Sequence, residues 1–301
     1  MEPVIGFIGI GAMGAPMSRN LLKAGFPLII YDLREKAIEE LAAEGAQKAS
    51  SPGDLARRCS TVITCLTASP EVEAAILGPG GVVEGAKPGT VVIDMSSSYP
   101  SSTIMICESL ATKGISMLDA PISGGTKGAR EATLAIMVGG DEELFKECLP
   151  IFEAMGKNIY HVGNIGAGHT VKALNNLCSA TTMAITSEAL VLAAKMGLDP
   201  NKVIDVINSS SGQSWSSHFK FPTFVLNNAF NSGFTIALMN KDLDMATRLG
   251  REHHVPMFVG AAVQQLFNYA MSQGGGGECH TAIAKFIEDW GGVKVRSKQG
   301  G

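Results

Sequence analysis

The sequence has little charge, few aromatic residues and no closely spaced pair of cysteines. Charged residues make up 17% and aromatic residues 6% of its 301 positions, whereas 46% are hydrophobic. This balance indicates a globular chain with a large core. The formal net charge of -4 gives no electrostatic reason to expect a nucleic-acid partner. The length favours two domains over one.

The cysteines and histidines show no spacing that suits a metal site or a disulfide framework. The adjacent His253 and His254 would point about 100° apart on a helix, which is poor geometry for one metal ion. The six cysteines are scattered without a C-x-x-C pair: Cys59, Cys65, Cys107, Cys148, Cys178 and Cys279. We therefore expect no bound metal and a reducing, cytoplasmic location.

No segment predicts a membrane anchor. The apolar start of the chain has no basic region before it, which argues against a signal peptide. The other long apolar run, Leu174–Leu198, is interrupted by polar residues such as Ser179, Glu188 and Lys195. It therefore predicts a buried helix and not a membrane span, and we expect no membrane partner.

The first half of the chain alternates short apolar runs, typical of strands, with helical patterns. The expected strands are Val4–Ile8, Leu28–Tyr31, Thr61–Leu66, Thr90–Met95, Met117–Ala120, Leu134–Val138 and Ile159–Val162. The expected helices between them include Pro16–Ala24, Lys36–Glu44, Ser101–Lys113 and Asp141–Met155. Such alternation indicates a mostly parallel α/β sheet, and a run as apolar as VVIDM fits a sheet covered on both faces.

The strand signals stop after about Gly163, and the rest of the chain predicts helices. The expected helices are 170–196, Pro200–Asn208, Ser216–Asn228, Lys241–Glu252, Pro256–Met271 and Thr281–Asp289. We therefore expect an α/β domain at residues 1–163 and an all-helical domain at residues 164–301.

A glycine-rich loop follows the first expected strand. In VIGFIGIGAMG, the glycines have the G-x-G-x-x-G spacing and stand between a strand and a helix. Such a loop uses glycine for a tight turn, for close approach of a pyrophosphate and for helix–strand packing, and the helix N-terminus offers free N–H groups to phosphate. It predicts a Rossmann dinucleotide site with contacts from Gly9, Ile10, Gly11, Ala12, Met13 and Gly14.

The second expected strand ends in Asp32, roughly 20 residues after the loop, where a carboxylate can bind the adenosine ribose hydroxyls. Its charge would repel the 2′-phosphate of NADP, so NAD is the expected cofactor. The nearby Arg34 is able to hold that phosphate, which leaves NADP open. The alternative is an ordinary glycine-rich turn followed by a strand-end aspartate.

Four segments, in this order, resemble the signature segments of the β-hydroxyacid dehydrogenase family. They are GFIGIGAMGAPMSRNLLKAG, DAPISGGTKGAREATLAIMVGG, GAGHTVKALNN and MNKDLDMA. The resemblance spans nearly the whole chain. It implies a Rossmann domain followed by an all-α domain built around a long interdomain helix, with the active site in the cleft between them. It also implies homodimers or homotetramers built through the helical domain.

The third segment carries Lys172, with Asn176 one helical turn later. Oxidation of an alcohol by NAD needs a base for the hydroxyl proton, and burial or a nearby positive nicotinamide lowers the pKa of a lysine toward neutrality. Asn176 shares the helical face of Lys172, and Ser179 and Met183 continue that face. The resemblance makes the lysine the catalytic acid/base, with the asparagine beside it. The alternative is a surface lysine on an exposed helix edge.

The resemblance also implies substrate-binding residues. The loop of Ser123, Gly124 and Gly125 would hold the substrate carboxylate through backbone N–H groups and the serine hydroxyl, although such a loop can be only a strand-to-helix turn. Trp215 lies in a segment that matches a substrate pocket. Lys241 would reach both substrate and cofactor, unless it is only an exposed helix start.

Three further residues match cofactor contacts of the family: Leu66, Thr67 and Ser97. Thr67 stands where relatives usually have proline, which weakens the match at Leu66 and Thr67. His169 precedes Lys172 by three positions, and we interpret it as a residue of the helix start.

These features together predict an NAD-dependent dehydrogenase that interconverts a small β-hydroxy acid and its semialdehyde. SSGQSWSSH resembles members that act on 3-hydroxyisobutyrate, whereas SGGTKGA and GKNIYHVG resemble members that act on 2-(hydroxymethyl)glutarate, so the substrate stays open. An imine reductase or a non-catalytic NAD(P)-binding protein on the same fold are the alternatives. Lys172 argues against the first, and the combination of Lys172, Asn176 and the Ser123 loop argues against the second.

Overall fold

A computed structural model describes residues 3–296 of the chain. Contacts between residues divide the chain into two compact units, with the division between Lys172 and Ala173. This division falls inside the helix α9 (Ala167–Lys195). The expected domain boundary between residues 163 and 164 lies just before that helix, and it stays a prediction.

The first unit contains a nine-stranded sheet. Its order is β3-β2-β1-β4-β5-β6-β8-β7, with β9 paired to β8. The strands are β1 (Ile5–Ile8), β2 (Leu28–Tyr31), β3 (Gln47–Lys48), β4 (Thr61–Thr64), β5 (Val91–Asp94), β6 (Ser116–Asp119), β7 (Ile122–Ser123), β8 (Leu134–Gly139) and β9 (Gly156–Gly163). Strands β1 to β6 are parallel, and β8 is antiparallel to β6 and β7. The order 3-2-1-4-5-6 confirms the predicted Rossmann domain, and a ligand site is expected beyond β1 and β4, where the strand order reverses.

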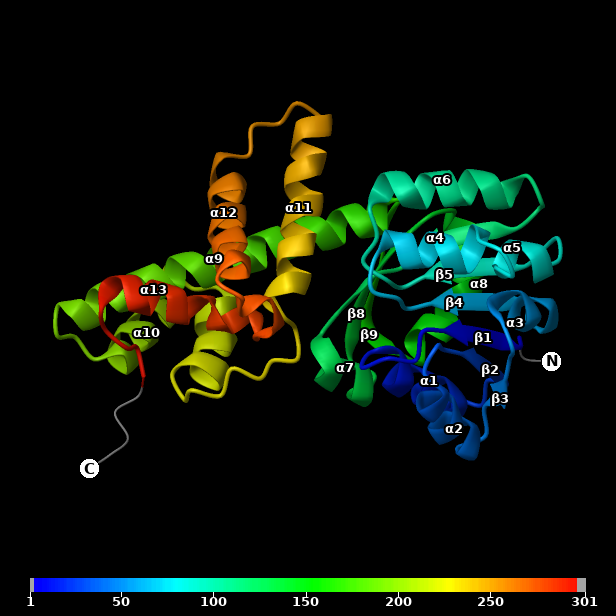
Figure 1. Cartoon of the computed structure of the whole chain (residues 1–301), viewed down its shortest axis with the longest axis horizontal. Helices are drawn as coiled ribbons and strands as arrows, with labels where there is room; N and C mark the ends of the chain where they lie inside the picture. The colour runs from blue at the N-terminus through cyan, green and yellow to red at the C-terminus, as the bar shows by residue number, and fades with distance from the viewer. Residues whose placement is uncertain (1–2, 297–301) are drawn as a thin grey trace. The chain divides into compact units, whose positions relative to one another are not determined.

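Helices cover both faces of this sheet (Figure 1). Neighbouring residues of a strand point to opposite faces, so Ile93 of β5 joins one core and Val92 joins the other. The first core packs against α1 (Gly14–Lys23), α2 (Glu35–Ala43), α7 (Gly125–Glu131) and α8 (Glu142–Glu153). The second packs against α3 (Pro52–Arg58), α4 (Ser69–Leu77), α5 (Val82–Gly85) and α6 (Pro100–Ala111). Burial on both faces explains why the strands are continuously apolar.

The second unit is built from helices, which confirms the predicted all-helical part. After α9 it contains α10 (Pro200–Asn208), the π-helix η1 (Ser216–Val225), α11 (Ile236–Glu252), α12 (Phe258–Ser272), the 3-10 helices η2 (Gly275–Gly277) and η3 (His280–Ala282), and α13 (Ile283–Gly291). Helices α11 and α12 lie side by side (Figure 1). Met183, Phe221 and Phe267 lie in its core.

Helix α9 accounts for the longest apolar run of the chain. Within residues 3–296 it is the one helix long and apolar enough to cross a membrane by length and composition, a test that buried helices also pass. Ala180, Met183 and Leu190 of α9 pack in the core of the second unit. These contacts bury apolar side chains of α9 inside the protein.

Candidate active site

The glycine loop lies at the carboxyl end of β1. A Cβ on Gly14 would lie 1.9 Å from the carbonyl oxygen of Gly9, so α1 can begin this close to the strand only with glycine. A Cβ on Gly11 would meet Arg34 Nη2 at 3.7 Å, which is ordinary contact. No contact within the protein therefore requires glycine at position 11. A glycine there leaves room for the pyrophosphate of a ligand to approach the backbone closely. The loop fits a dinucleotide.

Asp32 lies beside this loop, at the end of β2. Its carboxylate accepts hydrogen bonds from Ile10 N at 2.9 Å and from Arg34 N at 2.9 Å. The Arg34 guanidinium donates to both carboxylate oxygens and to Ile10 O at 3.1 Å. Burial alone would raise the pKa of Asp32, but the hydrogen bonds and charge of Arg34, with the Ile10 N–H, outweigh it and lower that pKa. Asp32 is thus an ionised group fixed at the loop, and the Arg34 guanidinium is paired with its carboxylate.

The expected cofactor contacts at Leu66, Thr67 and Ser97 lie after β4 and β5, two neighbouring strands. Leu66 N donates to Ser96 Oγ at 2.9 Å. Asp94, fully buried at the end of β5, accepts hydrogen bonds from the side chains of Thr64 and Ser98 and from Ser96 N. These bonds hold both loops at the carboxyl edge of the sheet, next to β1.

Asp119 holds the start of α9 against the sheet. Its carboxylate is buried at the end of β6 and accepts Gly166 N at 2.7 Å and His169 N at 2.8 Å. Gly166 directly precedes α9 and His169 lies in its first turn, where no helical carbonyl is available to these N–H groups. Lys172 follows one turn later and is 7% exposed. The lysine therefore stands on a helix whose beginning is fixed, and it is not a surface residue of an exposed edge.

His169 links this helix start to two strand ends. Its ring is fully buried, with Nδ1 2.8 Å from Thr103 Oγ1 and Nε2 3.2 Å from Ser96 O. Asp94 and Asp119 lie 3.6 and 3.5 Å from the ring nitrogens. His169 does belong to the helix start, as expected, but its contacts reach further. The sequence analysis did not predict the network of Asp94, Asp119 and His169. Two aspartates that end neighbouring parallel strands could have indicated it.

In the second unit, Asn176 and Lys241 are brought together by Asp242. Asn176 Nδ2 donates a short hydrogen bond to Asp242 Oδ2, and Lys241 Nζ lies 3.1 Å from Asp242 Oδ1. Asn176 and Asp242 are buried. Lys241 and Asp242 lie inside α11, which begins at Ile236, and not at a helix start. Asp242 is a further residue missed in the sequence, and it fixes the orientation of the Asn176 amide.

The remaining expected substrate residues occupy two separate places in the chain. Ser123 ends the short strand β7, and α7 begins at Gly125. Gly124 and Gly125 have φ values of 135° and 63°, a conformation that favours glycine and presents successive N–H groups, as anion-binding turns do. Trp215 lies at the start of η1, is 65% exposed and packs on Phe219 with ring centroids 4.9 Å apart.

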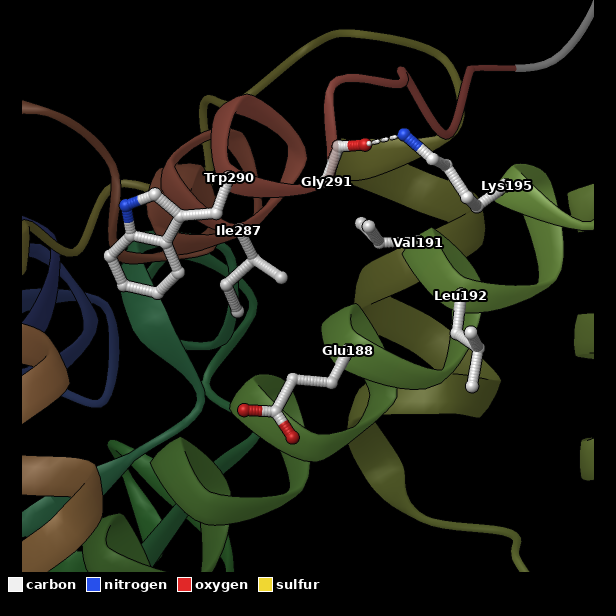
Figure 2. Close-up of a pocket in the computed structure, with 7 residues that line it drawn as sticks. All are labelled: Glu188, Val191, Leu192, Lys195, Ile287, Trp290 and Gly291. Atoms are coloured by element: carbon white, nitrogen blue, oxygen red, sulfur yellow. Dashed lines mark hydrogen bonds between the residues drawn. The ribbon is translucent and has the colours of Figure 1, made fainter.

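A hollow of about 400 Å³ lies elsewhere in the second unit (Figure 2). Glu188, Val191, Leu192 and Lys195 of α9 line it opposite Ile287, Trp290 and Gly291, and Lys195 Nζ donates to Gly291 O at 2.8 Å. None of the expected site residues lines it. Within residues 3–296, no group of three or more His, Cys, Asp or Glu side chains is placed to hold a metal.

Comparison with known proteins identifies relatives along the whole chain. The family model for the NAD binding domain of 6-phosphogluconate dehydrogenase matches residues 4–163, and the model for the NAD-binding domain of NADP-dependent 3-hydroxyisobutyrate dehydrogenase matches residues 166–287. The chain is 43% identical to 2-(hydroxymethyl)glutarate dehydrogenase of Eubacterium barkeri, covering 98% of each chain. It is 39% identical to NAD-dependent L-serine dehydrogenase of Pseudomonas aeruginosa, covering 90% of this chain and 93% of the relative.

A search of solved structures also finds proteins that are similar over nearly the whole chain. A Mycobacterium tuberculosis 3-hydroxyisobutyrate dehydrogenase, solved with L-serine, is similar with a TM-score of 0.89 and 33% identity, covering 95% of this chain and 99% of that one. An imine reductase from Myxococcus stipitatus has a TM-score of 0.66 at 18% identity, which shows a shared fold alone.

Proposed function

The chain belongs to the β-hydroxyacid dehydrogenase family, and from this premise we propose that it oxidises a small β-hydroxy acid to the semialdehyde with NAD, using Lys172 as the acid/base. Membership makes the chain an NAD(P)-dependent dehydrogenase of hydroxy acids. The proposal adds the cofactor preference, the residue roles and the nature of the acid.

The observation that carries the proposal is the burial of Lys172 one turn after the anchored start of α9. NAD, when bound, accepts the hydride. Lys172 Nζ takes the hydroxyl proton during oxidation and returns it during reduction. Asn176, oriented by Asp242, donates to or accepts from the substrate hydroxyl without adding charge.

NAD is the proposed cofactor because Asp32 lies at the ribose end of the glycine loop and keeps its charge. A 2′-phosphate would lie against this carboxylate. Arg34 would have to leave Asp32 in order to hold the phosphate.

We expect the protein to use NAD with a higher kcat/KM than NADP, and Asp32→Ala to narrow that gap because a repulsive charge is removed. The matched variant Arg34→Ala should affect NADP use more than NAD use. Steady-state rates with both cofactors for all three proteins check this. A native preference for NADP would mean that Arg34, and not Asp32, sets the choice.

The substrate is proposed to carry a carboxylate that is held by the loop of Ser123, Gly124 and Gly125. Positive φ values at both glycines and the serine hydroxyl support an anion site there. The relatives act on different acids: one is named for 2-(hydroxymethyl)glutarate, one for L-serine and others for 3-hydroxyisobutyrate. All of these carry a carboxylate near an alcohol.

We expect the protein to oxidise β-hydroxy acids at least about tenfold more efficiently than their esters or amides, since a hydrogen bond to a charged group contributes roughly 1.5–3 kcal/mol. Ser123→Ala should raise KM for the acid more than KM for a matched neutral alcohol. Equal changes for both would show that the loop shapes the site without binding the carboxylate. Lys241 would then be the first residue to test.

A homodimer or homotetramer in the cytoplasm is the proposed state of the protein. The second unit exposes large apolar side chains on α12, with Phe258 85% and Val259 65% exposed. Exposed apolar surface of this kind is typical of protein interfaces. Sedimentation at micromolar concentration measures the assembly, and a monomer there would contradict it.

A further inference from the structure

His169 is a buried histidine to which the proposed chemistry assigns no part. It lies in the first turn of α9, three positions before Lys172, and its side chain is fully buried. Its hydrogen-bond partners belong to the same compact unit as Lys172. Burying a polar ring is costly unless its nitrogens have hydrogen-bond partners. The partners of His169 therefore show which parts of the unit it joins.

The two ring nitrogens of His169 reach two different elements. Nε2 lies 3.2 Å from Ser96 O, in the loop after β5, and Nδ1 lies 2.8 Å from Thr103 Oγ1 of α6. A carbonyl oxygen only accepts, so Nε2 carries a hydrogen and donates it to Ser96. The Thr103 hydroxyl also lies 3.2 Å from Tyr99 O, but Nδ1 is the nearer acceptor. By donating to Nδ1, Thr103 keeps the ring hydrogen on Nε2.

Ser96 connects this histidine to both loops in which cofactor contacts are predicted. Its hydroxyl oxygen accepts Leu66 N at 2.9 Å, from the loop after β4, and its own N–H donates to Asp94 at 3.0 Å. Ser97, a predicted cofactor contact, is the next residue. The carbonyl of Ser96 is thus fixed at the predicted cofactor site, and His169 is bound to that carbonyl.

The backbone of His169 is held as well as its ring. Its N–H donates to Asp119 Oδ2, at the end of β6, at 2.8 Å. Residues three apart on a helix are neighbours on its surface, and α9 continues unbroken through Lys172. Because the first turn is fixed at two points, α9 cannot turn about its axis without breaking one of these contacts. They therefore set where Lys172 stands relative to the loops after β4 and β5.

We infer that His169 is a positioning residue of the proposed reaction, which uses its bond to Ser96 O to hold Lys172 at a fixed distance from the cofactor site. The inference rests on the proposed function, because it takes Lys172 to be the acid/base. Proton transfer requires hydrogen-bond reach, and a misplacement of about 1 Å can lower a rate by about 10²-fold. Loss of His169 should therefore lower kcat, while cofactor affinity stays nearly normal because the glycine loop and Asp32 are unchanged.

The test replaces the imidazole by two amides of different length. The side-chain nitrogen of glutamine lies about as far from the backbone as Nε2, so His169→Gln can still donate to Ser96 O, whereas the shorter side chain in His169→Asn does not reach it. In oxidation of a β-hydroxy acid, kcat should fall about 10²-fold in His169→Asn and stay close to the wild-type value in His169→Gln. The control Thr170→Val removes a hydroxyl of the same turn, which donates to Gly166 O, and should keep the wild-type kcat.

A double-mutant cycle shows whether His169 acts through Lys172. In the Lys172→Ala background, His169→Asn should cause almost no further loss of kcat, because the group that it positions is already absent. Fluorescence titration with NADH should show full cofactor binding in each variant, which confirms that the proteins are folded. Additive losses would show an independent structural effect and overturn the inference, as would equal kcat values for His169→Gln and His169→Asn.

A second pair of variants decides the matter if His169→Asn does not fold. In Thr103→Val the ring loses its donor at Nδ1, and the ring hydrogen can move there, toward Asp119 Oδ2 at 3.5 Å. Thr103→Val should then lower kcat, whereas Thr103→Ser keeps the hydroxyl and the rate, and equal rates would refute the positioning role. A normal kcat in His169→Asn beside an inactive Lys172→Ala refutes that role alone, whereas a normal kcat in Lys172→Ala refutes the proposed function.

Discussion

Lys172→Ala is expected to lower kcat for oxidation of a β-hydroxy acid by a factor of about 10²–10⁴, the contribution of positioned acid–base catalysis. The variant removes the group that takes the hydroxyl proton, while the glycine loop and Asp32 stay unchanged. NAD should therefore bind with nearly normal affinity. Initial rates of NADH formation measure the first effect, and quenching of protein fluorescence by NADH measures cofactor binding.

Two comparisons separate this role from a general effect of removing a lysine. Lys195→Ala changes an exposed lysine on the same helix and should leave kcat nearly unchanged. Oxidation by the wild-type protein should rise with pH, because Lys172 must be neutral to accept a proton, and Lys172→Ala should lose that rise. A variant with nearly normal kcat would refute the acid/base role.

Asp119→Asn is expected to cause the largest loss of stability among single changes near the site. Its two carboxylate oxygens accept the N–H of Gly166, just before α9, and the N–H of His169, in the first turn. An amide has one accepting oxygen and presents an NH₂ group to the other donor. A buried donor without a partner costs roughly 1–3 kcal/mol, and a repulsive contact adds to it. We expect Tm to fall by about 5 °C or more, and kcat to fall with it because Lys172 follows this turn.

Asp141→Asn provides the matched control for this loss. Asp141 is exposed and caps α8 through one bond, from Leu144 N at 2.9 Å, and asparagine caps helices about as well as aspartate. Thermal melts of the two variants should therefore differ clearly. Similar melting temperatures for both would show that the Asp119 contacts contribute little.

Local patterns predicted much of the fold. The strand Leu28–Tyr31 and the helix Pro200–Asn208 match the structure at both ends, because apolar runs and a proline at a helix start are local signals. The strand Gln47–Lys48 was not expected, since it has two exposed polar residues and is defined only by its pairing with β2. The helix Gly125–Glu131 was also missed, because its glycines and charged residues give no helical period.

The residues of the site also differ in whether a short motif or a distant contact identifies them. Lys172, Asn176 and the glycine loop were predicted because each belongs to a short contiguous motif. Asp119 was not, since its role depends on backbone groups 47 and 50 positions later in the chain. A single sequence does not indicate such pairings, which the fold creates.

Helix α9 has a consequence for how this chain can be recombined with those of its relatives. Its start is bound to Asp119 through backbone N–H groups, which every residue except proline supplies, whereas later residues of α9 pack in the core of the helical unit. A hybrid joined between Lys172 and Asn176, inside α9, would inherit these two residues from different parents. A hybrid joined at residues 164–166 would inherit both from one parent. The proposed acid/base and its neighbouring asparagine would then be exchanged together, while the glycine loop stays with the other parent.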